Sequence, residues 1–328
     1  MKARALVFVA PGRVEIRDVD AGEPGDGDVV VRTAYSGISA GTELLAYRGE
    51  LDTGLVLDET IASLGGTFAY PFAYGYSCAG VVEAGALPAG TPVFAFHPHQ
   101  DRFVTSGADV VLLGEVGLRE GTLFPLVETA LQVSLDAGPV LDDVVVVTGL
   151  GVVGLLTALV LGRAGARVVG VEPRAWRREV AAAVGVEVCP PHEVADRVAA
   201  ATDGRGVPLA VEASGNPEAL AGVLPWLAHE GTALVASWYG SKPVTLPLGA
   251  EFHRRRLVIR STQVSTIPAH LSGRWTVARR REAAVRLLSE LPIGTLATHE
   301  FPVSEAASAY AAIDRAEEGL LHAALWYG

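Results

Sequence analysis

Hydrophobic residues follow two different rhythms along this chain. Up to about residue 113, short β-branched runs alternate with glycine and proline turns, as in ALVFVAPGRVEI and DVVVRTAYSGI. This rhythm predicts an antiparallel β-domain. From about residue 123 the pattern changes to strand, helix, strand, helix, beginning with VVVVT, VVGLLTALVLGRA and RVVGVE. Such alternation predicts an α/β domain in which a doubly wound parallel sheet carries helices on both faces.

The last part of the chain departs from this alternation. A polar-apolar helix, ARRREAAVRLLSEL, is followed by a predicted strand at 299–301, a helix at 304–315 and a terminal strand at 322–327. We interpret this tail as a return to the first domain. The predicted organisation is therefore a β-rich domain of residues 1–122 and 267–328, and an α/β domain of residues 123–266.

Length and composition agree with two folded domains. The chain has 328 residues, half of them hydrophobic and 19% charged, which is enough apolar material for two cores. Its formal net charge of -11 argues against a nucleic-acid partner, because phosphate binding needs a basic surface. The one basic run, residues 254–256, we interpret as a solvated loop or strand entry.

Cysteine usage and the N-terminal sequence bear on the compartment. Cys78 and Cys189 lie far apart without a CxxC pattern, which argues against a disulfide framework. The N-terminus lacks the apolar run and cleavage site of a secretory signal, so we expect a cytoplasmic protein. The uncharged run 144–162 has the length of a membrane span, but its glycines fit a nucleotide-binding turn better, and we expect no membrane association.

That glycine pattern, GLGVVG, lies directly between a predicted strand and a predicted helix. In this context Gly149 permits a tight turn, Gly151 lets a pyrophosphate approach the backbone, and Gly154 allows close helix packing. Val152 and Val153 begin the helix, whose N-terminal N–H groups favour phosphate. The pattern predicts a dinucleotide site.

An acidic residue extends the predicted dinucleotide site. Glu172 ends the next strand, at roughly the 20-residue spacing at which a carboxylate binds the adenosine ribose hydroxyls. A carboxylate there favours NAD(H), whereas Arg174 and Arg177 leave NADP(H) open if Glu172 turns away. Three polar residues in the later segments PLAVEAS, GTALVASW and RLVIRST complete the predicted cofactor set: Ser214, Ser237 and Thr262.

Nearly the whole chain resembles the medium-chain dehydrogenase/reductase superfamily, in which a GroES-like β-domain precedes a Rossmann domain and the chain returns at its end. The phrases SGISAGTE, VFAFHPHQDRFV, EFHRRRLVIRSTQV and ATHEFP are most similar to its bacteriochlorophyllide-type branch. The resemblance implies a small-molecule substrate and a homodimer formed through an edge strand near residues 257–261.

The zinc-binding motifs of that superfamily are altered here. Zinc alcohol dehydrogenases carry S-G-I-C-G-T-D, whereas this chain has Ser39-Ala40 in place of the cysteine. The histidine of their G-H-E motif is replaced by Tyr76, and the four-cysteine lobe is absent. His97 and His99 are separated by one proline and have no evident third ligand, so we predict no metal site.

The resemblance also implies catalytic candidates. Thr42 matches the hydroxyl residue that relays the alcohol proton, and Tyr76 takes the lost histidine's place. His97 matches a pocket-lining position and is the favoured acid, because an ordinary imidazole titrates near neutral pH. Glu43 and Tyr47 follow Thr42 on a predicted helix and complete the candidates for one predicted cleft.

One further carboxylate stands apart from this group. Glu128 matches a glutamate near the metal in the polyol-dehydrogenase branch. Without a metal it becomes a candidate for binding substrate or for supporting the residues that do.

These features predict zinc-independent hydride transfer between NAD(H) and a secondary alcohol or ketone. Reduction of a polarised C=C bond also needs no zinc and stays open. A protein of another class, which binds NAD(H) as a sensor without turnover, is the third alternative. Absence of any absorbance change at 340 nm with alcohols, ketones and enones would favour the sensor.

Overall fold

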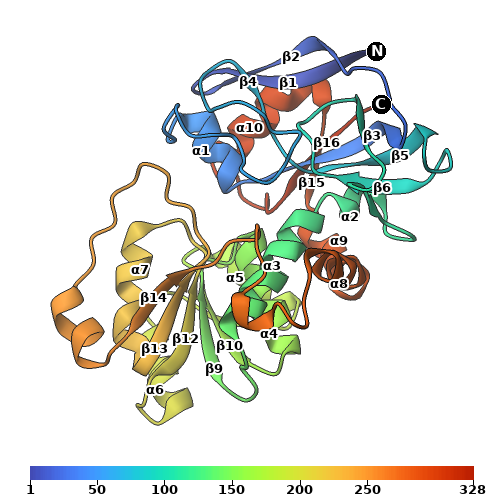
Figure 1. The fold of residues 1–328 in the computed structure, drawn as a ribbon. Coiled ribbons are helices and arrows are strands. Elements are labelled where there is room, and N and C mark those ends of the chain that lie inside the picture. The colour runs from blue at the N-terminus through green and yellow to red at the C-terminus, as the bar shows by residue number, and fades with distance from the viewer. The chain divides into compact units, whose positions relative to one another are not determined.

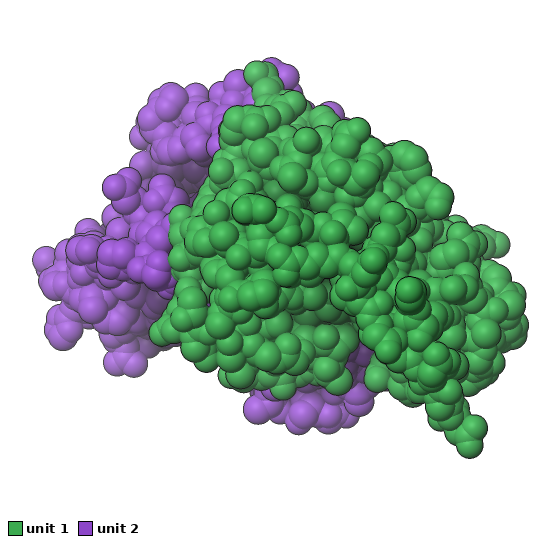
Figure 2. Space-filling view, turned by 90° about the horizontal axis from the view of Figure 1, so that it is seen from above, with its two compact units in different colours: residues 1–125, 285–328 green, residues 126–284 purple.

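The computed structural model describes residues 1–328, and the chain divides into two compact units. Unit 1 comprises residues 1–125 and 285–328, and unit 2 comprises residues 126–284 (Figure 2). The predicted boundary between the α/β domain and the C-terminal part of the β-rich domain lies at 266/267, whereas the compact units divide at 284/285. The reason is that Arg280, in the first turns of helix α8 (Val277–Glu290), donates hydrogen bonds to helix α3 (Phe124–Ala137) of unit 2.

Unit 1 is built on two sheets, whose strand pairs are antiparallel as predicted except that β15 pairs parallel with β16. A three-stranded sheet has the order β2-β1-β4, and a seven-stranded sheet has the order β15-β16-β3-β5-β6-β8, with β7 also paired to β3 (Figure 1). The strands are β1 (Lys2–Ala10), β2 (Arg13–Asp20), β3 (Asp28–Ile38), β4 (Phe72–Ala73), β5 (Cys78–Gly85), β6 (Pro92–Ala95), β7 (Arg102–Ser106), β8 (Val111–Leu112), β15 (His299–Pro302) and β16 (Ala323–Trp326). Because β16 pairs antiparallel with β3, the C-terminal tail does return to the first domain.

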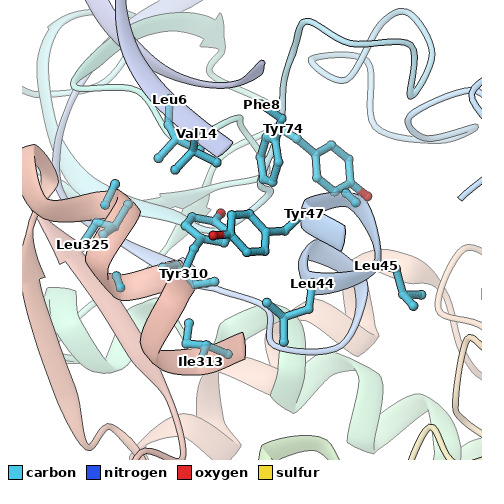
Figure 3. Close-up of a cluster of buried hydrophobic side chains, with 14 of the residues drawn as sticks. Leu6, Phe8, Val14, Leu44, Leu45, Tyr47, Tyr74, Tyr310, Ile313 and Leu325 are labelled. Atoms are coloured by element: carbon cyan, nitrogen blue, oxygen red, sulfur yellow. The ribbon is translucent and has the colours of Figure 1, made fainter. Parts of the chain in front are cut away.

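Four short helices complete unit 1. They are α1 (Thr42–Arg48), α2 (Leu118–Gly121), α9 (Ile293–Leu296) and α10 (Ala306–Asp314). Helices α1 and α10 enclose a hydrophobic core in which Phe8, Tyr47 and Tyr310 are buried (Figure 3). The Tyr47 and Tyr310 rings stack with centroids 5.4 Å apart, which ties the N-terminal and C-terminal parts of the unit together.

Unit 2 is a six-stranded, fully parallel sheet with the order β11-β10-β9-β12-β13-β14. Its strands are β9 (Val144–Thr148), β10 (Arg167–Val171), β11 (Glu187–Cys189), β12 (Val207–Glu212), β13 (Leu227–Val235) and β14 (Val258–Ser261). The connecting helices are α4 (Val152–Arg163), α5 (Ala175–Ala183), α6 (Val194–Thr202) and α7 (Pro217–Val223).

This strand order places the candidate cofactor residues. The chain runs outward from β9 to β11 and then crosses back to β12, so the winding direction reverses between β9 and β12. With right-handed crossovers, helices on the two sides of this point lie on opposite faces of the sheet. Ligands of such sheets bind at the carboxyl ends of the strands beside the reversal. The GLGVVG turn follows β9 at that point.

None of the helices combines the length and the apolar composition that crossing a membrane requires. The uncharged run 144–162 is divided between strand β9 and helix α4, with the glycine turn between them.

Candidate functional site

The GLGVVG turn has the geometry that its glycines predict. Gly149 has φ +80°, and a Cβ on it would lie 2.4 Å from the Cα of Ser214. A Cβ on Gly154 would lie 1.8 Å from the carbonyl oxygen of Gly149. Neither position tolerates a side chain, because backbone atoms occupy the space.

Gly151 is different, because the space above it is open. A Cβ there would meet only Nη1 of Arg177, at 4.0 Å. Gly151 is also the N-cap of α4, and no side chain caps this helix, which begins with Val152 and Val153. An uncapped helix N-terminus beneath an open glycine fits a diphosphate, whose oxygens accept the first N–H groups of the helix.

Glu172 lies next to this turn, directly after β10, and its side chain is buried. Its carboxylate accepts hydrogen bonds from the backbone N–H of Leu150 at 2.9 Å and of Arg174 at 3.0 Å. Arg177 Nη1 lies 3.8 Å from the same carboxylate. Burial lowers the pKa of Arg177, although Glu172 counteracts this, and Arg177 Nε is buried without a hydrogen-bond partner. These bonds hold the buried carboxylate in one orientation beside the GLGVVG turn.

The remaining cofactor candidates follow other strands of the sheet. Ser214 comes after β12, Ser237 after β13 and Thr262 after β14, so all three lie at the carboxyl edge. Ser237 Oγ accepts the N–H of Gly215 at 2.8 Å, and the hydroxyl of Thr262 donates to Asp136 at 2.5 Å. These hydroxyls are engaged within unit 2, at the edge of the sheet where the sequence predicts a dinucleotide.

In unit 1, three hydroxyl side chains gather where β3 leads into α1. We call Ser39, Thr42 and Tyr76 the hydroxyl cluster. Burial raises the pKa of Tyr76 to about 12, with a contribution from the nearby charge of Glu43, while hydrogen bonds from Ser39 and Thr42 act in the opposite direction. Tyr76 and Thr42 are partly exposed, whereas Ser39 is buried.

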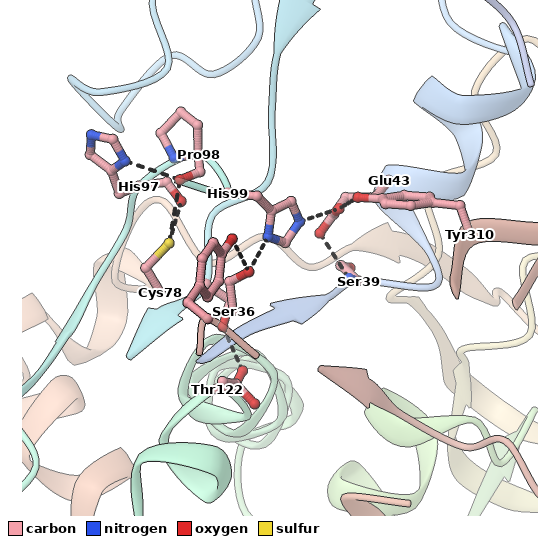
Figure 4. A network of polar contacts seen from close by, with 11 residues as sticks. Ser36, Ser39, Glu43, Cys78, His97, Pro98, His99, Thr122 and Tyr310 are labelled. Atoms are coloured by element: carbon pink, nitrogen blue, oxygen red, sulfur yellow. Dashed lines mark hydrogen bonds and ion pairs between the residues drawn. The ribbon is translucent and has the colours of Figure 1, made fainter. Parts of the chain in front are cut away.

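His97 differs from the sequence-based expectation. Its ring stacks on Phe103 with centroids 3.9 Å apart, and its Nδ1 lies 3.0 Å from the carbonyl oxygen of Pro98. Burial lowers the pKa of His97 to about 4, so the ring is neutral at pH 7. The argument that its ordinary pKa makes it the favoured acid therefore does not apply to this side chain. In Figure 4 it points away from His99.

Glu43 lies in a polar network whose members are buried except for Tyr327, which is partly exposed. Its carboxylate accepts the N–H of Ser39 at 2.8 Å, contacts His99 Nε2 at 2.8 Å and accepts the hydroxyl of Tyr310 (Figure 4). On its other side, His99 Nδ1 lies 2.7 Å from Ser36 Oγ. Ser36 Oγ in turn lies 2.9 Å from the hydroxyl of Tyr327. We call these residues the Glu43 network.

A serine, a histidine and a glutamate in hydrogen-bonded sequence are the groups of a nucleophilic triad. Here Ser36, His99 and Glu43 each have 0% exposure, and Ser36 Oγ is already bonded to Tyr327. A triad needs a nucleophile that a substrate can reach, so this arrangement does not support hydrolysis.

Two further candidates are engaged by side chains of their own unit. Tyr47 is buried in the core against Tyr310, and burial raises its pKa. Glu128 has 2% exposure and forms an ion pair with Arg280 at 3.0 Å. The structure therefore gives Tyr47 a packing role and Glu128 a role in joining α3 to α8.

The donor set does not fit zinc. The cysteine and histidine positions of zinc-binding relatives carry Ser39 and Tyr76, both neutral hydroxyls, and zinc prefers thiolate, imidazole or carboxylate ligands. The adjacent carboxylate, Glu43, already contacts three hydrogen-bonding groups. No three His, Cys, Asp or Glu side chains come close enough to hold a metal ion together.

Sequence reasoning missed several buried polar residues. Glu212 has 0% exposure and accepts the hydroxyl of Tyr239 at 2.5 Å. His99 was considered only as a metal ligand, and Arg280 was not singled out within its predicted helix. His322 is buried with neither ring nitrogen hydrogen-bonded. The one local signal was Glu212 at the end of a strand that is otherwise apolar.

A β-domain joined to a doubly wound sheet with a glycine-rich turn defines a two-domain, dinucleotide-binding class of protein. A model of the zinc-binding dehydrogenase family matches residues 152–279. The chain is 30% identical to the 2-desacetyl-2-hydroxyethyl bacteriochlorophyllide A dehydrogenase of Cereibacter sphaeroides, over 95% of this chain and 94% of that protein.

Solved structures of dehydrogenases share the fold. The 2R,3R-butanediol dehydrogenase of Bacillus subtilis superposes with a TM-score of 0.81 at 17% identity, covering 99% of each chain. An Escherichia coli alcohol dehydrogenase complexed with NADH gives a TM-score of 0.78 at 17% identity, again covering 99% of each chain. The chain belongs to the medium-chain dehydrogenase/reductase superfamily and is an oxidoreductase.

Proposed function

We propose that this enzyme transfers a hydride between NAD(H) and a secondary alcohol or ketone without zinc. The hydroxyl cluster, set in unit 1 where zinc-binding relatives place metal ligands, is the observation that carries the proposal. The similar proteins add support, since their names describe dehydrogenation of hydroxyl-bearing compounds such as a hydroxyethyl bacteriochlorophyllide and threonine.

The residues of unit 2 fit the cofactor, which supplies or accepts the hydride when bound. The first turn of α4, beneath Gly151, would hold its diphosphate, and the buried carboxylate of Glu172 would accept the adenosine ribose hydroxyls. A carboxylate at this position repels a 2′-phosphate, which supports NAD(H) over NADP(H). Arg177 lies within 3.8 Å of Glu172 and largely neutralises that repulsion, so we expect a preference rather than exclusion.

The hydroxyl cluster supplies the proton in this proposal. Hydride addition to a carbonyl places negative charge on its oxygen, which needs a hydrogen-bond donor within reach. Tyr76 keeps its proton at neutral pH, because its pKa is about 12, and it is still far more acidic than an alcohol. Ser39 and Thr42 favour the ionised form of the Tyr76 hydroxyl, and the partly exposed Thr42 is the candidate through which the proton is replaced from solvent.

Substitution of Tyr76 tests this assignment. Tyr76→Phe keeps the ring and removes only the hydroxyl, so it should lower kcat by roughly 10²- to 10⁴-fold while NAD(H) affinity stays unchanged. His97→Phe is the comparison, and we expect a smaller loss because that imidazole is neutral and stacked on Phe103. The measurement is the absorbance change at 340 nm with secondary alcohols, ketones and enones. A larger loss for His97→Phe than for Tyr76→Phe would refute the assignment.

We also propose that the enzyme is a homodimer joined through β14. This strand is the edge of the parallel sheet, and its Val258 is 45% exposed. An edge strand with an exposed apolar side chain offers unpaired backbone groups to a second copy. Sedimentation of the wild type and of Val258→Lys tests the proposal, and a monomeric wild type would refute it.

A further inference from the structure

Two separate segments carry the hydroxyl cluster, and one buried side chain connects them. Ser39 and Thr42 lie where β3 leads into α1, whereas Tyr76 lies between β4 and β5. Catalysis through the cluster requires a fixed distance between these segments. His99, on a third segment, contacts both.

The first connection runs through Glu43. His99 Nε2 lies 2.8 Å from Glu43 Oε2, and the other carboxylate oxygen accepts the backbone N–H of Ser39 at 2.8 Å. Glu43 directly follows Thr42 in the first turn of α1. The orientation of this carboxylate therefore fixes the backbone that presents both Ser39 and Thr42.

The second connection is a direct contact with the residue before Tyr76. Gly75 has φ +99°, and a Cβ on it would lie only 2.3 Å from Cδ2 of His99. The backbone N–H of His99 also donates to the carbonyl oxygen of Tyr74 at 3.1 Å. The imidazole is thus packed against the segment that presents Tyr76.

The remaining partners hold the imidazole itself. Ser36 Oγ lies 2.7 Å from Nδ1, so both ring nitrogens are hydrogen-bonded (Figure 4). His99 and Glu43 have 0% exposure, so bulk solvent does not reach these bonds. A buried network with all its members satisfied is rigid, and removal of one member leaves a buried group without its partner.

We propose that His99 is a positioning residue that holds the two segments of the hydroxyl cluster together through Glu43 and Gly75. It does not touch the substrate in this arrangement, because it is fully enclosed. The inference rests on the proposed function of the cluster. It assigns to His99 a side-chain link that adds to the backbone hydrogen bond between the two segments, in which Gly37 N–H donates to the carbonyl oxygen of Ser77 at 2.8 Å.

The experiment compares His99→Leu with His99→Gln. Leucine removes both hydrogen bonds, whereas glutamine retains an amide donor near the position of Nε2 and can still reach Glu43. His322→Leu is the matched control, because His322 is also a buried imidazole of unit 1 but neither of its ring nitrogens has a hydrogen-bond partner. Tyr310→Phe removes another donor to Glu43 and replaces His99→Leu if that variant does not fold.

Two readouts are measured for each variant. The first is kcat, with NADH affinity from fluorescence titration as the check on unit 2. Displacement of catalytic groups by about 1 Å lowers the rate ~10²-fold, so we expect His99→Leu to lower kcat by about 10- to 100-fold with NADH affinity unchanged.

The second readout is hydrogen exchange of a peptide covering residues 36–47. Loss of one hydrogen bond to a charged group should speed its exchange by roughly 10- to 150-fold.

The proposal holds if His99→Leu shows both effects, His99→Gln recovers most of each, and His322→Leu shows neither. Faster exchange with unchanged kcat would overturn it, because the network would then be purely structural. Unchanged exchange would also overturn it. If the wild type turns over no alcohol, ketone or enone, the proposed function fails and this inference falls with it. The exchange data, which need no substrate, tell these two failures apart.

Discussion

Replacement of Glu128 tests the interpretation of this carboxylate as a structural group. Glu128 and Arg280 each have 2% exposure, and Arg280 Nε lies 3.0 Å from Glu128 Oε1. Arg280 also donates to Gln132 at 2.5 Å, so one guanidinium joins α8 to two residues of α3. In Glu128→Leu the guanidinium would stay buried without its carboxylate.

The magnitude follows from the balance between burial and attraction. Burial raises the pKa of Glu128 although Arg280 and Arg281 lower it, so desolvation outweighs the attraction of the two arginines. Such a pair adds little net stability, yet loss of one partner costs about 3–5 kcal/mol. We expect Glu128→Leu to lower the free energy of unfolding by that amount. The double variant with Arg280→Met should return to within about 1 kcal/mol of the wild type.

Urea unfolding followed by tryptophan fluorescence measures both values. Unit 2 contains every tryptophan of the chain except Trp326, so the signal reports mainly on the unit that holds the pair. A cost below about 1 kcal/mol for Glu128→Leu would refute the reasoning, as would a double variant no more stable than the single one. Loss of turnover at unchanged stability would instead return Glu128 to the substrate site.

Three further predictions concern the cofactor site, the hydroxyl cluster and acid stability. Glu172→Ala should weaken NAD(H) binding by roughly 10- to 150-fold in a fluorescence titration and narrow the discrimination against NADP(H), whereas a wild type that prefers NADPH would contradict the assignment. Gly75→Ala should lower the free energy of unfolding by about 1–3 kcal/mol or more, because φ is +99° and the methyl would strike His99; an unchanged urea midpoint would contradict this. Burial lowers the pKa of His322 from 6.5 to about 4, so between these values the unfolded chain binds a proton that the folded chain excludes. The free energy of unfolding therefore falls by up to about 3 kcal/mol as the pH falls from 6.5 to 4. His322→Leu should remove this contribution, and an equal pH dependence of stability in wild type and variant would contradict the prediction.

The sequence predicted what is encoded locally. Strand β9, the GLGVVG turn and helix α4 follow one another directly, so periodicity and glycine placement sufficed to find them. Glu172 was found for the same reason, since it ends the next strand. The return of the C-terminal tail was predicted from its strand pattern, although helix α10 begins two residues later than expected, after a 3-10 turn at Val303–Glu305.

The sequence could not predict the Glu43 network, because its members come from separate parts of the chain. Ser36, Glu43, His99 and Tyr310 meet only after β3, α1 and α10 have packed, and no local pattern records their burial. The same limit applied to His97. His97 lies two residues from His99 in the sequence. It was assigned the catalytic role because histidine ordinarily titrates near neutral pH, but burial lowers the pKa of this side chain to about 4. The compact units divide after the predicted domain boundary, in a helix whose Arg280 pairs with Glu128, a residue 152 positions away.

The most direct test of the account is the effect of metal removal on turnover. Purified protein is analysed for zinc, and the rate of absorbance change at 340 nm with a secondary alcohol or ketone is measured before and after dialysis against EDTA. Because Ser39 and Tyr76 replace the thiolate and imidazole ligands, we predict well under one zinc per chain and an unchanged rate. One zinc per chain, with the rate lost on chelation and restored by added zinc, would contradict the account.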